Sequence, residues 1–152
     1  MPTQYFAFVC LLFSCGNAGS SEYVIGEVSA MLNNYHEAIE KYGLEAELDY
    51  LDDSHEFFWV PPGYRTALDF DSVTAVLRVT DPSISAIQIH WDSLKIIPLR
   101  DDLAQFYGTI TMQTTDTTGT ITTGHLVETG LVIKRSDGWK LLNGQSAFFE
   151  SL

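Results

Sequence analysis

The side chains in this sequence that could carry acid–base chemistry are scattered, and the candidate catalytic pair is Asp92 with His125. A histidine titrates near neutral pH, so the two could remove and return a proton on a molecule held between them. If the hairpins of the C-terminal third pair symmetrically, Asp92, Ile110 and His125 lie in one row across three strands. The two polar groups would then be roughly 10 Å apart. The alternative is that both lie near the rim of the sheet, in solvent or bonded to neighbours.

The candidate ligand-binding residues are aromatic or amide side chains predicted to face an interior. Tyr35 falls in the middle of the apolar face of a helix, and a buried tyrosine hydroxyl needs a partner. Trp59 and Tyr64 belong to an aromatic-rich stretch at residues 57–64, which suits the mouth of an apolar pocket. Gln145 is predicted on the inner face of the last strand, where an amide must be hydrogen-bonded or face water in a cavity. Ordinary core packing is the alternative for each.

No spacing in the sequence is typical of a metal, phosphate or nucleophile site. The four histidines, at positions 36, 55, 90 and 125, show no His-x-x-x-His pair. A glycine-rich phosphate loop and a G-x-S-x-G elbow are also missing from the sequence. We therefore predict no metal and no cofactor.

The charge of the chain argues against nucleic acid as a partner. Eight basic residues against twenty acidic ones give a formal net charge of −12, and the basic residues are scattered. Binding to phosphates needs a basic footprint, and an anionic membrane surface is disfavoured for the same reason.

Residues 1–21 are predicted to be a signal or lipoprotein-like segment followed by a tether. An uncharged apolar run at residues 5–14 has the length of a signal-peptide core and is too short to span a bilayer. Residues 12–15 (LFSC) resemble a lipobox, which makes Cys15 the candidate lipidation site, and residues 16–21 are small and polar. We expect an exported protein, periplasmic or anchored to a membrane through Cys15. A cytoplasmic protein with an apolar N-terminus is the alternative.

Residues 22–152 carry the periodicities of one domain, since 152 residues with 45% hydrophobic content suit a single core. Apolar residues at steps of three and four predict a helix over residues 22–43, and a second, shorter one over residues 44–53. A short edge strand follows at residues 56–60. Asp69 or Asp71 is placed to cap a third helix over residues 72–79.

The C-terminal third predicts four antiparallel strands joined by short turns. Their expected ranges are residues 86–99, 103–115, 121–135 and 139–149. Symmetric pairing gives an inner face, against which the helices pack, that carries His90, Asp92, Leu94, Ile96, Ala104, Phe106, Gly108, Ile110, His125, Val127, Thr129, Leu131, Ile133, Trp139, Leu141, Asn143, Gln145 and Ala147. A slip of one residue in any turn would move a whole strand to the other face.

The chain resembles the nuclear-transport-factor-2-like superfamily, and within it the SnoaL-like group of bacterial proteins. The resemblance rests on residues 48–53 (LDYLDD), on Ala104-x-Phe106-x-Gly108, and on residues 134–141 (KRSDGWKL). It covers about residues 22–149. It implies an α+β, cone-shaped fold of three N-terminal helices packed on a curved, mainly antiparallel sheet. It also implies a pocket between the two layers and, often, a homodimer formed through the outer face of the sheet.

The resemblance allows two functions, because such a scaffold does not fix its activity. Ketosteroid isomerases in the superfamily place a base carboxylate directly before a Pro-x-Gly turn, where this chain has Val60, so isomerase chemistry is disfavoured. The preferred hypothesis is an exported domain that binds a small apolar ligand or a protein partner without catalysis. The alternative is a cyclase-, isomerase- or dehydratase-type enzyme for a small hydrophobic carbonyl compound, with His125 or Asp92 as base and Tyr35 as donor.

Overall fold

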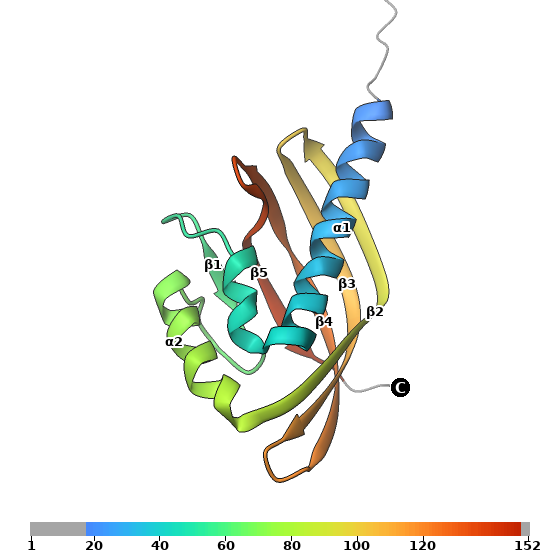
Figure 1. The fold of residues 1–152 in the computed structure, drawn as a ribbon. Coiled ribbons are helices and arrows are strands. Elements are labelled where there is room, and N and C mark those ends of the chain that lie inside the picture. The colour runs from blue at the N-terminus through green and yellow to red at the C-terminus, as the bar shows by residue number, and fades with distance from the viewer. Residues whose placement is uncertain (1–17, 150–152) are drawn as a thin grey trace, which may run out of the picture.

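The computed structural model describes residues 18–149, in which helices cover one face of a curved five-stranded sheet (Figure 1). The helices are α1 (Ala18–Tyr42), the 3-10 helix η1 (Leu44–Tyr50) and α2 (Phe70–Thr80), followed by a single 3-10 turn, η2 (Asp81–Ser83). The predicted α+β, cone-shaped fold with three N-terminal helices is confirmed. Cys15 and most of the predicted signal segment lie outside the described residues.

Helix α1 forms because its apolar residues recur at steps of three and four and are buried on one side. The buried set is Val24, Val28, Met31, Leu32, Tyr35 and Ile39. The helix ends at Gly43, whose φ of 93° is a backbone conformation that glycine adopts without steric cost. No helix within residues 18–149 is both long enough and apolar enough to cross a membrane.

Helix α2 begins where the sequence places a capping residue. The Asp69 side chain accepts a hydrogen bond of 2.9 Å from the backbone N–H of Ser72, which satisfies one of the free donors of the first turn. Val73 and Leu77, one turn apart, turn inward and are buried. The helix therefore extends two residues before and one residue beyond the predicted range.

The sheet has the strand order β1-β5-β4-β3-β2. Its strands are β1 (Phe58–Val60), β2 (Ile84–Arg100), β3 (Leu103–Asp116), β4 (Ile121–Arg135) and β5 (Gly138–Phe148). Only the pairing of β1 with β5 is parallel among these strands. The four long strands match the predicted ranges to within two residues, and β1 is the predicted edge strand.

The predicted register fails in β2 because of a β-bulge at Asp92. Trp91 pairs with Ile110 and Ser93 pairs with Thr109, so Asp92 has no partner in β3. One extra residue moves the side chains that precede it in the strand to the opposite face of the sheet. Trp91 therefore faces inward, and the prediction that Asp92 and His90 lie on the inner face is wrong.

The pairing of β3 with β4 differs from the predicted one by a single residue. Ile110 lies opposite Leu126, and His125 lies opposite Thr111. Because side chains alternate between faces, this shift moves His125 to the outer face and brings Glu128 to the inner face. The whole predicted inner set of β4 is therefore wrong.

A second bulge, at Leu142, divides β5. Val132 pairs with Leu141 and Leu131 pairs with Asn143, so Leu142 has no partner in β4. Trp139 and Leu141 therefore face inward as predicted, whereas the residues after Leu142 lie on the face opposite to the predicted one. Gln145 pairs with Thr129 and is exposed on the outer face, so its predicted inward placement is wrong. Ser146 is buried in its stead.

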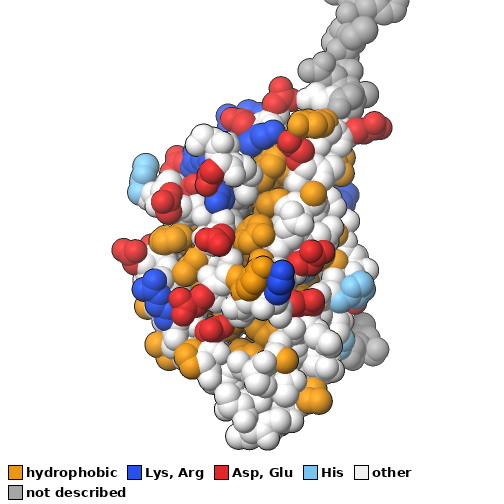
Figure 2. Space-filling model, in the orientation of Figure 1, with side chains coloured by type: hydrophobic (Ala, Val, Ile, Leu, Met, Phe, Trp, Pro, Cys, Tyr) orange, Lys and Arg blue, Asp and Glu red, His pale blue; other side chains and the backbone are white. Residues whose placement is uncertain are grey.

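The core lies between the helices and the inner face of the sheet. Its largest fully buried side chains are Phe106, Leu32, Leu141, Val28 and Val132. Acidic side chains are spread over the outside of the helical layer and outnumber basic ones there (Figure 2).

Candidate active site

A pocket of about 190 Å³ lies between the inner face of the sheet and the helices. Aliphatic and aromatic side chains make up most of its wall, and its polar side chains are Tyr35, His36, Glu47, Glu128 and Ser146. A cavity of roughly 150 Å³ can hold benzene. The pocket therefore has room for a molecule with a single ring.

Glu128 is held in the pocket by a short chain of hydrogen bonds. The buried Ser146 hydroxyl donates to Glu128 Oε1 at 2.8 Å, and the Trp59 indole N–H donates to Ser146 Oγ at 3.1 Å. Burial raises the pKa of Glu128 to about 7, although the bond from Ser146 favours the charged form. This carboxyl group is thus fixed in direction and titrates near neutral pH.

Glycine makes room for the indole ring of Trp59 against the sheet. A Cβ atom at Gly144 would lie 2.6 Å from that ring and 2.4 Å from the carbonyl oxygen of Thr129. Gly144 pairs with Gly130 in the neighbouring strand, where a Cβ would also collide with backbone. The glycine pair therefore lets Trp59 lie close enough to the strand to reach Ser146.

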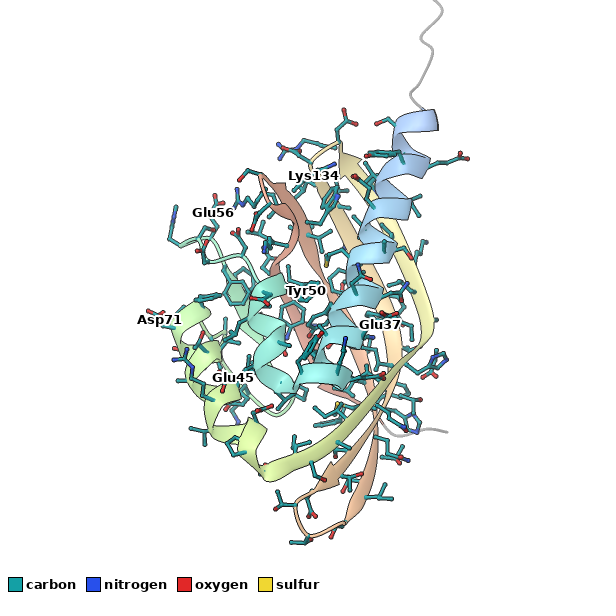
Figure 3. The ribbon with its side chains drawn as sticks, viewed as in Figure 1. Glu37, Glu45, Tyr50, Glu56, Asp71 and Lys134 are labelled. Atoms are coloured by element: carbon teal, nitrogen blue, oxygen red, sulfur yellow. The ribbon has the colours of Figure 1, made fainter. Side chains whose placement is uncertain are left out.

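Glu47 brings the second carboxyl group, from η1. Burial raises its pKa to about 8, the negative charge of Glu128 adds to the rise, and hydrogen bonding with Tyr35 partly offsets it. Of the other two acidic residues in η1, Glu45 is exposed and pairs with Arg78 of α2 (Figure 3). A half-buried carboxyl group that lines the pocket thus lies two residues after an exposed one in η1.

Tyr35 and His36, from α1, complete the polar part of the pocket. Burial, followed by the charge of Glu47, raises the pKa of Tyr35 well above its usual value, so its hydroxyl stays protonated. His36 stacks on the Trp91 ring at a centroid distance of 4.6 Å, and burial lowers its pKa to about 4. At neutral pH the pocket therefore contains a neutral imidazole and a neutral phenol.

This arrangement can supply an acid and a base at the same pH. Two carboxyl groups that disfavour each other's charge lose their protons one after the other. Near pH 7 to 8 the charged member can accept a proton while the protonated member can donate one. Proton transfer on a bound carbonyl or hydroxyl compound is the chemistry open to such a pair.

The structure brings two of the sequence-predicted binding residues to this pocket. Tyr35 and Trp59 line it. Tyr64 follows β1, is 44% exposed and is not part of the wall, and Gln145 lies on the outer face. A binding role for these four residues stays a prediction.

The predicted catalytic pair, Asp92 and His125, lies on the outer face of the sheet, where Thr111 connects the two side chains. Thr111 Oγ1 donates to Asp92 Oδ2 at 2.9 Å, and it lies 3.1 Å from His125 Nδ1. Since the hydroxyl proton points to the aspartate, the histidine must donate from Nδ1. Asp92 and His125 thus belong to one polar chain outside the pocket, and their catalytic role stays a prediction that no observation tests.

Glu47 and Glu128 are functional candidates that the sequence patterns did not predict, for different reasons. Glu47 lies three residues after Leu44, which is one turn of a 3-10 helix, and both line the pocket, so its spacing from an apolar residue was a usable signal. Glu128 lies between Val127 and Thr129, which the symmetric pairing places on the inner face, so its true position requires the one-residue offset between β3 and β4.

The pocket has no set of ligands for a metal ion. Within residues 18–149 no group of three or more histidine, cysteine, aspartate and glutamate side chains is close enough together to hold one. Two carboxyl groups with apolar surroundings suit protons or an organic ligand better than Ca²⁺ or Mg²⁺, which take six or more oxygen ligands.

Comparison with known families finds one match, to the SnoaL-like domain, over residues 28–149. No curated protein matches the sequence significantly.

Solved structures with the same architecture are numerous but distant in sequence. A nuclear transport factor 2-like superfamily protein from Salmonella enterica superposes with a TM-score of 0.72 at 14% identity, covering 86% of this chain and 94% of that one. A hexachlorocyclohexane dehydrochlorinase gives 0.69 at 10% identity, covering 85% and 87%. A ketosteroid isomerase-like protein from Erwinia carotovora gives 0.65 at 17%, covering 83% and 96%. At these identities the likeness establishes the fold alone.

Proposed function

The chain belongs to the SnoaL-like domain family of the nuclear-transport-factor-2-like superfamily, and on this basis we propose that its pocket binds one small, largely apolar molecule of single-ring size. The observation that carries the proposal is a pocket with apolar walls and a few polar groups gathered around Glu47 and Glu128. Pockets for small molecules have this composition. The alternative from the sequence is that the domain binds a protein partner instead of a small molecule.

A matched pair of variants tests the binding proposal. The probe is cyclohexanone, followed by ligand-detected NMR. Met112 lines the pocket and Gln113, its neighbour in β3, faces outward. We expect saturable binding that Met112→Trp abolishes by filling the pocket and that Gln113→Trp leaves intact. Absence of saturable binding to the wild-type chain would refute the proposal.

The second candidate function is proton-transfer catalysis on the bound molecule, and the carboxyl pair favours it. The charged carboxylate would take a proton from the carbon next to a carbonyl group, and the protonated carboxyl would give its proton to the carbonyl oxygen. The product is the enol, with no change in oxidation state. Two solved structures of the same fold are named as a dehydrochlorinase and as a ketosteroid isomerase-like protein, so this fold is also found in proteins named as enzymes.

Deuterium exchange separates the two candidates. In D₂O the α-protons of cyclohexanone should exchange faster with the wild-type chain than in buffer, and Glu128→Gln and Glu47→Gln should each remove at least about 1.4 kcal/mol of that acceleration, a factor of ten. Binding without any accelerated exchange would leave the non-catalytic proposal and eliminate the proton-transfer one for this probe.

A further inference from the structure

The charged groups in the pocket are of one sign. Glu47 and Glu128 are its acidic members, and no lysine or arginine is part of the wall that the structure describes. The titratable groups that face the pair are Tyr35 and His36 of α1, and both are neutral at pH 7. His90, from β2, acts on His36 and lowers its pKa further. A ligand therefore meets a negative field that no residue of the wall compensates.

An isolated carboxylate in an apolar pocket is unfavourable, because it has lost water without gaining a counter-ion. Protons on the pair avoid this cost when no cation is bound. A positive ligand would avoid it in another way, by pairing with the carboxylates directly. The two aromatic rings in the wall, Tyr35 and Trp59, could add attraction between a cation and their π faces.

We infer that the ligand of this pocket is a ring-sized molecule that carries a protonated amine, with its ammonium group held between Glu47 and Glu128 and its apolar body against the walls. The inference rests on the proposed binding function and adds the charge of the ligand to it. A ligand with a carboxylate or phosphate group is disfavoured, because the wall that the structure describes offers it no lysine or arginine. The 190 Å³ volume excludes a molecule with several fused rings.

Binding of an ammonium ion must displace protons from the pair. With pKa values of about 8 and about 7, Glu47 and Glu128 together hold between one and two protons at pH 7. A cation lowers both pKa values, so protons leave as it binds. Amine affinity should then rise with pH until the amine itself loses its charge, while the affinity for an uncharged analogue should not.

The test compares cyclohexylamine with cyclohexanol, which have the same ring and differ in charge. Calorimetry at pH 7.5 in phosphate and in HEPES measures both affinity and proton release. We expect cyclohexylamine to bind at least about tenfold more tightly than cyclohexanol, with proton release that makes the two buffers differ. Between pH 6 and pH 7.5 the amine affinity should rise by roughly tenfold.

Three variants show whether Glu47 and Glu128 cause the preference for cyclohexylamine over cyclohexanol. Glu47→Gln and Glu128→Gln should each remove most of the preference for the amine, and Glu45→Gln, the exposed carboxyl group of the same helix, should retain it. Circular dichroism shows whether each variant is folded. For the wild-type chain, carboxyl ¹³C shifts of both glutamates on adding cyclohexylamine give a readout that needs no substitution.

Each remaining outcome decides something different. If cyclohexanol binds as tightly as cyclohexylamine, or if both folded Gln variants keep the preference, the amine inference is overturned and the pocket still binds small molecules. If neither probe binds and cyclohexanone does not bind either, the proposed function fails together with the inference.

Discussion

Glu47 and Glu128 differ from most carboxyl groups of this acidic chain because they are withdrawn from water without a basic partner. Asp52, which is buried, has such a partner: it accepts two hydrogen bonds of 2.8 Å from Arg135, and Arg135 holds the pKa of that carboxyl low. A buried carboxylate beside an arginine stays charged and already has its counter-ion. A half-buried pair that lines a pocket without an arginine is available for a ligand or for a proton.

The pocket carboxyl groups make the stability of the protein depend on pH. Their folded-state pKa values of about 8 and about 7 lie above the ordinary 4.5 of glutamate, so the folded chain binds more protons than the unfolded chain between pH 4.5 and 8. The stabilisation is complete below pH 4.5 and is lost as pH rises through both values. We expect the free energy of unfolding in urea to fall by at least about 1 kcal/mol from pH 6 to pH 8.

Substitution shows whether these two residues cause the slope. Glu47→Gln combined with Glu128→Gln should flatten it, whereas Glu45→Gln should leave it unchanged. A wild-type chain whose stability does not change over this range would contradict the raised pKa values.

At the scale of the element, the inner face of the sheet depends on two bulges and one offset. The ranges of the strands follow from alternation and turn residues, and the sequence predicts them well. The bulge at Asp92 and the one at Leu142 leave no local signature, since an extra residue in a strand looks like any other residue. This is why Phe106 and Leu141 were predicted correctly while Asp92, His125 and Gln145 were placed on the wrong face.

The bulge in β2 also fixes the position of Trp91 over β3. A Cβ at Gly108 would collide with the Trp91 ring and would lie 2.7 Å from the carbonyl oxygen of Ser93. Gly108→Ala should therefore destabilise the protein by about 1–3 kcal/mol, through overpacking. Thermal unfolding measures this.

A second glycine provides the control for that substitution. Gly26 lies on the exposed side of α1, and a Cβ added there would have no other group within 4 Å. Gly26→Ala should therefore stabilise the protein by up to about 1 kcal/mol, because alanine favours the helix. If both substitutions had the same sign, the packing of Trp91 on Gly108 would not be the cause.

At the scale of the whole molecule, the resemblance to a family predicted more than the residue patterns did. The residue patterns gave the ranges of the helices and strands, and the resemblance gave their packing on a curved sheet with a pocket between the layers, because the same layers recur in chains with little sequence in common. It could not give the polar groups of the pocket, since these depend on the register of this sheet.

The outer face of the sheet is the predicted dimer interface. It exposes Tyr107 and Ile97, which are 48% and 41% accessible, on the side away from the helices. We expect a homodimer in light scattering at high micromolar concentration, and Tyr107→Lys should shift it towards the monomer. Tyr42→Lys, on the exposed surface of α1, serves as the control, and a wild-type monomer would contradict the prediction.

Export is the second prediction at this scale, and it rests on the sequence of residues 1–21. Expressed in a bacterium, the full chain should be processed to a mature form that begins at Cys15 and carries lipid. Mass spectrometry of the membrane fraction measures this. Cys15→Ser should lose the lipid and Cys10→Ser should keep it, whereas an unprocessed chain in the cytoplasm would refute the prediction.

The hydrogen bonds that join Trp59 to Glu128 through Ser146 have a practical consequence: the intrinsic fluorescence of Trp59 depends on the state of the pocket. The indole N–H of Trp59 is one bond away from the hydroxyl that contacts the carboxylate, so a change of charge there alters the electric field across the ring. The fluorescence of Trp59 should shift as Glu128 titrates near pH 7 and again when a cation enters. Anyone screening compounds against this protein therefore has an intrinsic, label-free signal, which Trp59→Phe removes.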